Sequence, residues 1–369
     1  MNKPLRPSPP VRFLFNHLGG GPGGYKEAAL LCERLEHTGH DASLVTYDTS
    51  SLARYVGDSA ARVITPAEAL ARIRDKAPTV AVFWTNSLFN LRFAHQLAGH
   101  GALLSVAVHE PRKKWENVSL GFRARRLAAD AMQSAMCAMS PLWLVFSANG
   151  ERLIRPAAEK AGARLVSLAL YQKDYFDETA LVAQAGQRNW VCLAGSPGGS
   201  SGHEEWPQFA SLVKRRFPHL QPVLLYRGSK GNADWIGARD LAAAGIVKNP
   251  AIITDAEIRT VFSRSLAVVR LDRSCTQSGT TPVANMAGAP VIGRNIPGIS
   301  QDIVSGQTGF ALDDMGDPSA IEAALATIQR DPASFVVGAR RHFTENWGEK
   351  ALMAGMSRLA AAASTVFWE

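Results

Sequence analysis

Cysteine and long hydrophobic runs are both scarce in this sequence. The 369 residues include four widely scattered cysteines, with no CxxC pair and no spacing typical of metal ligands. We therefore expect neither a disulfide framework nor a zinc site, and we expect a reducing compartment. No stretch approaches the roughly 18 apolar residues of a membrane span, and the opening "MNKPLRPSPP" lacks the apolar core of a signal peptide. Together these absences predict a cytoplasmic protein.

Motifs that bind metals or nucleic acids are also missing. The sequence contains no Asp-x-Asp pair and no H-x-x-x-H spacing, and "HEEW" at 203 lacks the second histidine of a zincin motif. No nucleic-acid-binding motif occurs in the chain. We therefore predict no metal site and no nucleic-acid partner.

Positive charge is in excess and is concentrated in one segment. The chain has 40 Lys and Arg against 32 Asp and Glu. Six of these cations lie within 112–126, interleaved with Trp115 and Phe122. Basic and aromatic residues in this pattern suit a surface that lies on anionic lipid headgroups. The prediction is a peripheral protein on the inner face of the membrane, and a solvated basic face is the alternative.

Short apolar runs rich in β-branched residues alternate with longer helical patterns along the whole chain. This alternation is typical of βα units and of a parallel sheet covered on both faces. A first series of predicted strands lies at 11–15, 42–47, 79–84, 103–108, 142–147 and 164–170. A second series lies at 190–195, 222–226, 251–254, 266–271 and 289–293, with helices over 203–216, 234–244 and 318–329. We predict an α/β protein with two tandem, doubly wound, Rossmann-like domains and a cleft between them.

The same pattern predicts the domain boundaries. The segment 177–188, between the two series, is interpreted as a linker. We predict a first domain over 1–180, a second over 181–345, and a C-terminal helix over 346–369 that packs back toward the first domain. Doubly wound sheets bind ligands beyond the carboxyl ends of their strands, so residues that follow predicted strands are the functional candidates.

Glycine is gathered at one such strand end. "HLGGGPGG" follows the first predicted strand and precedes a helix predicted from about Tyr25 to Thr38. Glycine lets a ligand approach the main chain closely, and the first turn of a helix offers free amides. The spacing matches neither GxGxxG nor a Walker loop, and a structural turn is the alternative. The predicted ligand contacts are His17, Gly21, Gly23 and Gly24.

Charged and polar residues follow other predicted strands. His109 and Glu110 end one of them, where a histidine would orient a ligand and a carboxylate would act as a base. A structural histidine is the alternative. In the second domain, cations and hydroxyls at strand ends and at the start of a helix suit a phosphate group. The predicted residues are Arg227, Lys230, Arg273, Gln277, Ser278, Gly279, Thr280 and Thr281.

The most specific stretch lies within 274–312. "VANMAGAPVIGRNIPGISQDIVSGQTGFAL" resembles the donor-binding region of retaining glycosyltransferases of the GT-B fold, especially family 4. The Gly-rich stretch and "FSANGERLIRPAAEKAG" at 146–162 resemble two further segments of that family. The resemblance implies the GT-B fold and sugar transfer from a nucleotide-sugar donor, which is a co-substrate, so that no cofactor is expected.

The sequence departs from the family's pattern at the usual donor contacts. Two glutamates of the family fall here on Cys275 and Val283, neither of which is a carboxylate. The family's Arg and Lys after the first strand of the second domain fall within "GSPGGSSG", with Ser196 near the place of the arginine. The glutamate pair and the Arg/Lys motif are therefore missing.

The resulting prediction is a metal-independent glycosyltransferase that moves a hexosyl or related sugar to a glycan or lipid-linked acceptor. Its setting is bacterial surface polysaccharide or glycoconjugate synthesis, and retention is implied only by the resemblance. His109 and Glu110 are the predicted catalytic residues. The Gly-rich stretch and His17 line the acceptor side, and the phosphate-binding residues of the second domain hold the donor.

Two alternatives stay open. One is a catalytically silent GT-B protein that binds a glycan or partners an active transferase, because the glutamates are missing. The other is a transferase that uses a CMP-activated acidic sugar, for which a cationic cleft is suitable.

Replacing Lys113, Lys114, Arg125 and Arg126 with Gln should abolish binding to anionic vesicles. Each Lys or Arg near such a surface contributes on the order of 1 kcal/mol. Flotation with phosphatidylserine vesicles at low salt measures this binding. A wild-type chain that does not float establishes the solvated basic face instead.

Overall fold

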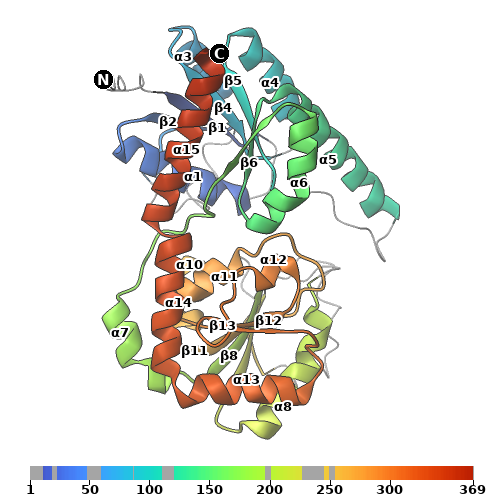
Figure 1. The fold of residues 1–369 in the computed structure, drawn as a ribbon, viewed down its shortest axis with the longest axis vertical. Helices are drawn as coiled ribbons and strands as arrows, with labels where there is room; N and C mark the ends of the chain where they lie inside the picture. The colour runs from blue at the N-terminus through green and yellow to red at the C-terminus, as the bar shows by residue number, and fades with distance from the viewer. Residues whose placement is uncertain are drawn as a thin grey trace, which may run out of the picture. The chain divides into compact units, whose positions relative to one another are not determined.

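The computed structural model describes residues 11–18, 23–47, 60–85, 87–109, 120–195, 201–226, 245–248 and 254–368. The chain divides into two compact units (Figure 1). The first unit comprises Met1–Lys173 together with Glu349–Glu369, and the second comprises Asp174–Gly348. Each unit is built around its own parallel sheet.

Within the described residues, seven strands form the sheet of the first unit. They are β1 (Arg12–Asn16), β2 (Asp41–Val45), β3 (Val63–Ile64), β4 (Thr79–Phe83), β5 (Leu103–Ala107), β6 (Leu142–Val145) and β7 (Arg164–Ser167). Their order across the sheet is β3-β2-β1-β4-β5-β6-β7, and every neighbouring pair is parallel. The strand order reverses at β1, which lies between β2 and β4. Such a reversal marks the ligand-binding edge of a doubly wound sheet.

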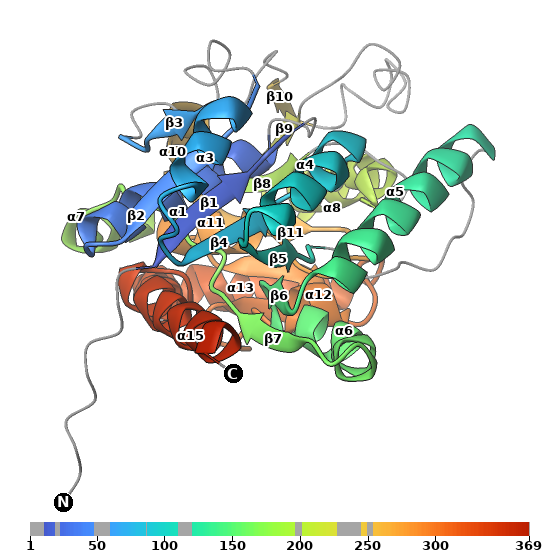
Figure 2. The same cartoon turned by 90° about the horizontal axis from the view of Figure 1, so that it is seen from above.

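Helices cover both faces of this sheet (Figure 2). They are α1 (Gly23–His37), α3 (Pro66–Ile73), α4 (Leu88–Gly99), α5 (Leu120–Met139), α6 (Ala148–Lys160) and α15 (Glu349–Trp368). One face packs on α3, α4, α5 and α6 through a cluster that includes Phe83, Phe93 and Leu97. Helix α1 contacts β1 and β2, and α15 contacts β7. Because both faces are covered, the strands are rich in apolar residues; all five side chains of β1 are buried, including those of Arg12 and Asn16.

Polar caps determine where several of these helices begin. The Thr65 hydroxyl accepts from the Glu68 amide, and the Glu68 carboxylate accepts from the Thr65 amide, which forms a capping box at α3. Ser87 and Ser147 cap α4 and α6 through their side-chain oxygens. Such a cap is worth about 1 kcal/mol. Helices α4 and α6 follow β4 and β6 directly, so these two caps shape the carboxyl edge of the sheet.

Within the described residues, six parallel strands form the sheet of the second unit. They are β8 (Trp190–Gly195), β9 (Gln221–Tyr226), β10 (Ile246–Lys248), β11 (Ser265–Arg270), β12 (Val291–Arg294) and β13 (Gly309–Leu312), in the order β10-β9-β8-β11-β12-β13. The helices are α7 (Glu178–Ala183), α8 (Trp206–Arg216), α10 (Asp255–Ser263), α11 (Thr280–Met286), α12 (Pro297–Ser300), α13 (Pro318–Arg330) and α14 (Pro332–Asn346). Helices α8 and α13 share one core cluster, and α10 and α11 share another.

The predicted doubly wound parallel sheets are confirmed in both units, and the differences lie in short elements. The strands β3, β10 and β13 were not predicted. Strands β3 and β10 span only two and three residues, and β13 begins with Gly309 at a φ of +140°, where glycine weakens the strand pattern. The predicted helix over 234–244 and residues 251–253 of a predicted strand lie outside the described residues.

The linker predicted over 177–188 is wrong. It forms α7 and a short 3-10 turn at Ala185–Gln187, and Leu181 packs with Val336 of α14 in a small core cluster. A polar segment of this length contains too few apolar positions to reveal the buried side. The division between the units falls after Lys173 and after Gly348 rather than after 180 and 345, and α15 belongs to the first unit.

The membrane-related predictions concern residues that the structure describes only in part. Residues 110–119 and the side chains of 120–126 lie outside the description, so the basic segment has no structural account. In the described part of the chain, no helix is both long and apolar enough to cross a bilayer.

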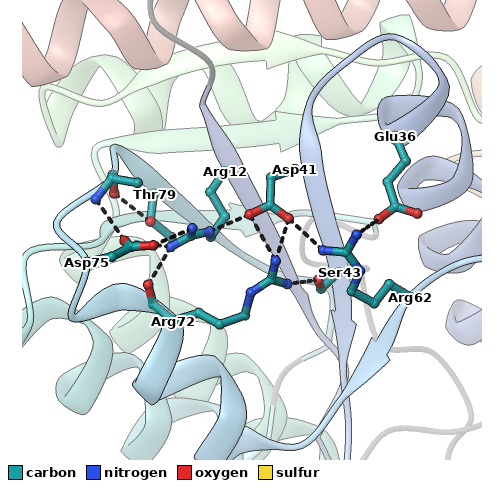
Figure 3. Close-up of polar contacts among 9 residues, drawn as sticks. Arg12, Glu36, Asp41, Ser43, Arg62, Arg72, Asp75 and Thr79 are labelled. Atoms are coloured by element: carbon teal, nitrogen blue, oxygen red, sulfur yellow. Dashed lines mark hydrogen bonds and ion pairs between the residues drawn. The ribbon is translucent and has the colours of Figure 1, made fainter.

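A network of ionic hydrogen bonds joins the amino ends of β1 and β2 to the turn before β4 (Figure 3). Arg12 Nε donates to Asp41 Oδ2 (2.7 Å), and both Arg12 Nη atoms donate to the Asp75 carboxylate (2.9 and 2.7 Å). Arg72 and Arg62 also donate to Asp41, at 2.8 and 3.1 Å. Arg12 is buried, so its charge is compensated by partners rather than by water.

The network lowers the pKa of both carboxyl groups. The hydrogen bond from Arg12 lowers the pKa of Asp75 to about 2. Burial opposes ionisation of Asp41, but the hydrogen bond from Arg12 and the charges of Arg72 and Arg62 outweigh it and lower the pKa of Asp41. The network therefore stabilises the fold above the unfolded-state pKa of about 4, and this contribution is lost as pH falls toward 2.

Arg12→Met should reduce the free energy of unfolding by about 2 kcal/mol, because it removes the charge-assisted hydrogen bonds that a buried arginine donates to Asp41 and Asp75. Urea denaturation at pH 7 measures the loss. The matched control is Arg216→Met, which breaks a solvent-exposed pair with Glu322 and should cost less than about 1 kcal/mol.

The pH dependence gives a second readout. Stability of the wild type should fall more steeply than that of Arg12→Met between pH 4 and pH 2. Equal losses for the two arginine variants, or parallel acid profiles, contradict the assigned role of Arg12.

Candidate functional site

The residues that follow β1 are hydrogen-bonded to the start of α4. The Leu18 amide donates to Asn90 Oδ1 (3.3 Å), and the Ser87 hydroxyl donates to the Leu18 carbonyl. The Asn90 side chain also donates to Thr85 Oγ1 (2.9 Å) and is fully buried. The point where the Gly-rich stretch leaves the sheet is therefore fixed by α4.

Three of the predicted acceptor-side residues lie in the described part of the chain. His17 follows β1, is fully buried, and its amide donates to the Val45 carbonyl (3.0 Å). Burial lowers the pKa of His17 to about 4, so the imidazole is neutral at physiological pH. Helix α1 begins at Gly23, so Gly23 and Gly24 form its first turn instead of preceding a helix that starts at Tyr25. A ligand contact from the His17 ring would require that ring to become exposed.

His109 lies in an aromatic cluster at the carboxyl ends of β4, β5 and β6. Its ring stacks on Phe146, with centroids 4.6 Å apart and an angle of 9° between the planes. Trp84 meets His109 edge to face at 5.0 Å, and Trp84 and Phe146 are themselves buried. The two aromatic rings fix the plane of the imidazole at the edge where doubly wound sheets bind ligands.

In the second unit, Arg270 gathers groups from two neighbouring strands. It is the last residue of β11, it is 9% exposed, and it pairs with Asp272 at 2.8 Å. Its Nη1 atom donates to Thr280 Oγ1 (2.5 Å) and to the carbonyl of Ala194 in β8 (3.5 Å). Arg270 therefore connects the end of β8 to the loop that precedes α11.

Gly195 and His203 lie beside Arg270. Gly195 ends β8 with a φ of +142°, and a Cβ placed there would lie 3.7 Å from His203 Cε1 and 3.9 Å from Arg270 Nη1. His203 is buried, and burial lowers its pKa; the charge of Arg270 acts in the same direction while that of Asp272 opposes it. The result is a neutral imidazole beside a cation at a strand end. The sequence offered one signal for His203, its place directly after a Gly-rich segment.

Glu205 is held between two arginines. Arg273 donates to Glu205 Oε1 (2.9 Å) and pairs with Glu204 (2.8 Å), and Arg294 pairs with Glu205 Oε2 (2.6 Å). Arg273, a predicted donor-binding residue, is thus engaged in ion pairs in this structure. Its role toward a donor stays a prediction.

The loop from Cys275 to Thr281 is held at several points. Ser278 Oγ accepts from the Thr281 amide (3.2 Å), and Cys275 Sγ donates to the Gln277 carbonyl (2.6 Å). A Cβ at Gly298 of α12 would lie 1.9 Å from the Cys275 carbonyl oxygen, so only glycine fits this approach. Gly279 precedes α11 and offers no side-chain cap. The loop and α12 are packed against each other at backbone contact.

Two buried arginines hold the opposite end of α11. Arg188 donates to the carbonyls of Ala287 and Gly288, both at 2.9 Å, and Arg340 donates to the carbonyl of Met286 (2.5 Å). Burial lowers the pKa of Arg188 to about 10, which leaves it cationic at neutral pH. Cations at a helix carboxyl terminus satisfy the last carbonyls and complement the helix dipole. Arg340 also binds both oxygens of Asp174, at 2.9 and 2.6 Å.

No carboxylate replaces the family's glutamates at their aligned positions. Cys275 is half-buried, and Val283 packs against the core cluster of α10 and α11. A carboxyl group that the sequence did not single out, Asp302, follows α12. Burial raises its pKa to about 7. The preceding residue, Gln301, donates to the Thr276 carbonyl (3.4 Å). Asp302 is therefore one residue away from a contact with the loop Cys275–Thr281.

Several predicted site residues have no structural account. Gly21, Glu110, Arg227 and Lys230 lie outside the described residues, as does Ser196, which is near the place of the family's missing arginine. In the described part of the chain, no group of three or more His, Cys, Asp or Glu side chains is arranged to hold a metal ion.

A pocket of about 240 Å³ lies between α8, the end of β12 and the start of α13. Phe209, Leu212 and Ile321 are among its apolar lining residues, and Glu205 and Arg294 lie on its wall. None of the predicted donor-binding residues lines this pocket. It is also separate from the Arg270 cluster, which consists of Arg270, Asp272, Thr280, Gly195 and His203.

Comparison with proteins of known structure identifies the fold. No protein-family model and no curated protein matches this sequence. The structure resembles the pneumococcal O-GlcNAc transferase GtfA in complex with UDP and GlcNAc, with a TM-score of 0.68 and 10% identity over 97% of this chain and 99% of that chain. It resembles Anabaena HepE in complex with UDP-glucose (TM-score 0.69, 12% identity, 96% and 99% covered). It also resembles a TarM mutant of S. aureus in complex with fondaparinux, α-GlcNAc-glycerol and UDP (TM-score 0.67, 9% identity, 95% and 99% covered). The predicted GT-B fold, with two Rossmann-like domains, is confirmed.

The His17 imidazole should titrate about two pH units below a solvent-exposed histidine, because its protonated form would be buried without water. NMR titration of the His17 ring, with a short histidine-containing peptide as the reference, measures the midpoint. Between the unfolded-state pKa of about 6.5 and pH 4, His17 should destabilise the fold as pH falls. A midpoint near 6.5 would show that the ring is solvated.

Proposed function

We propose that this protein is a glycosyltransferase that moves a sugar from a nucleotide-sugar donor to a glycan acceptor. The observation that carries the proposal is the likeness over at least 95% of the chain to structures that hold UDP or UDP-glucose, among them an O-GlcNAc transferase. The Arg270 cluster lies at a carboxyl strand end, where a doubly wound sheet binds a nucleotide.

The Arg270 cluster has the chemistry that a nucleoside diphosphate needs. Arg270 supplies a buried guanidinium, which also pairs with Asp272 and holds the Thr280 hydroxyl. Gly195 carries no side chain at the end of β8. A neutral His203 adds ring nitrogens without a second charge. Negative charge develops on the diphosphate as the glycosidic bond breaks, so fixed positive charge at this place lowers the barrier. Arg227, Lys230 and Arg273 are the further proposed donor ligands.

The acceptor side is assigned to the first unit. His109, fixed between Phe146 and Trp84, would orient the acceptor, and Glu110 would take the proton of its hydroxyl group as the new bond forms. Retention of configuration, a lipid-linked acceptor, and a role in bacterial surface polysaccharide synthesis at the inner membrane face extend the proposal. The family resemblance supports the first of these extensions, and the basic segment 112–126 supports membrane association.

A catalytically silent GT-B protein is the second candidate. The specific observation in its favour is that Cys275 and Val283 occupy the places of the family's two glutamates. Such a protein would still bind a nucleotide sugar or a glycan, but it would not break the glycosidic bond.

A panel of UDP-, GDP-, ADP- and CMP-sugars, screened by thermal shift and by NMR detection of released sugar, tests the proposal. At least one donor should stabilise the wild type and be hydrolysed slowly by water. Arg270→Lys keeps the charge but loses the planar fork, and it should weaken donor binding about tenfold or more. Arg216→Met, an exposed arginine of α8 in the same unit, is the matched control and should bind the donor as the wild type does.

The outcomes separate the candidates. Binding with hydrolysis supports the transferase, and binding without hydrolysis or transfer supports the silent protein. If no nucleotide sugar in the panel binds, or if Arg270→Lys binds as tightly as the wild type, the proposed donor site is wrong.

A further inference from the structure

Two aromatic side chains stand exposed at the carboxyl edge of the first sheet. Tyr47 is 61% exposed and Phe89 is 55% exposed, and their rings meet edge to face with centroids 5.9 Å apart. Phe15, Trp84 and Phe146, which belong to the same unit, are buried. Tyr47 and Phe89 thus contact each other without contributing to the core.

The rings come from the two strands on either side of β1. Tyr47 follows β2, and Phe89 is the second residue of α4, which follows β4. Because β1 lies between β2 and β4, the two rings meet beside the place where the chain leaves β1 and enters the Gly-rich stretch. This is the switch point of the sheet, where ligands bind in doubly wound folds.

Residues close to Phe89 hold the start of α4 in place. Ser87 and Asn90 both bond to the backbone of Leu18 at the exit of β1. These bonds fix the first turn of α4, and with it the backbone position of Phe89. A ligand that binds here would not have to order the protein, and preorganisation of this kind increases affinity.

We propose that Tyr47 and Phe89 form a stacking platform for a pyranose ring of the glycan acceptor; this inference rests on the proposed function. The face of an aromatic ring carries partial negative charge, and the C–H groups on one face of a pyranose carry partial positive charge. Stacking therefore removes apolar surface of both partners from water while the sugar hydroxyls stay solvated.

The size of the patch favours a sugar over a macromolecule. Within the described residues, the exposed large apolar side chains at this strand edge are Tyr47, Phe89 and the adjacent Leu88. Their combined surface is well below the roughly 800 Å² per partner that a stable protein interface buries. It matches one or two sugar rings.

The test compares acceptor binding in two pairs of variants. Tyr47→Ala and Phe89→Ala remove the stacking surface, whereas Tyr47→Phe and Phe89→Tyr keep it. Leu153→Ala, at an exposed apolar residue of α6 in the same unit, is the matched control.

The probe is an array printed with oligosaccharides of glucose, galactose, mannose and N-acetylglucosamine, followed by NMR titration of the glycan that binds best. The double alanine variant should bind that glycan at least tenfold more weakly, and the conservative variants and the control should stay within about threefold.

Binding of a second copy of the chain or of a lipid surface at Tyr47 and Phe89 would give different results. If the double alanine variant binds the glycan as the wild type does, or if the wild type binds no glycan on the array, the platform proposal is wrong. It is also overturned if light scattering shows a wild-type dimer that the double variant converts to a monomer, or if these substitutions abolish flotation with phosphatidylcholine vesicles.

Donor hydrolysis separates this inference from the function on which it rests. Water is the acceptor in that reaction, so the double alanine variant should bind and hydrolyse the donor as the wild type does. Donor hydrolysis without any glycan binding rejects the platform alone, and absence of donor binding rejects the proposed transferase.

Discussion

Parallel strand pairing is the constraint on which the rest of this structure depends. Every strand pair in the described residues is parallel, so each connection must cross the sheet and all carboxyl ends meet at one edge. In the first unit this places Leu18, Tyr47 and His109, which follow three different strands, at the same edge of the sheet. In the second unit it brings Gly195 and Arg270 together although 75 positions separate them (270 minus 195). The candidate sites are consequences of this arrangement.

The two edges of the first sheet differ in their chemistry. At the amino edge, Arg12 is bound by Asp41 and Asp75, and the network ties β1, β2 and the turn before β4 into one register. At the carboxyl edge, the residues that follow the strands include Tyr47, Trp84 and Phe146. The charges at the amino edge bond to one another and stabilise the fold. The carboxyl edge is the one that carries the candidate functions of this unit.

Helix α11 of the second unit is held at both of its ends. Arg188 and Arg340 hold its carboxyl end, while Arg270 and Ser278 hold the residues at its amino end. Asp174, the first residue of the second unit, is bound by the same Arg340. The place where the chain enters this unit and the end of α11 therefore share one buried cation.

The sequence by itself determined the fold class, the alternation of strands and helices, and the strand ends at which function was to be sought. Apolar β-branched runs identify buried parallel strands because both faces of such a sheet are covered. The short strands β3, β10 and β13 and the six-residue helix α7 were not predicted from the sequence. Only the tertiary structure decided which strand-end residues meet. Arg273 is paired with Glu204 and Glu205, His17 is buried, and Tyr47 contacts Phe89 across β1. Contacts between residues far apart in sequence depend on strand order and packing, which no local pattern of residues encodes.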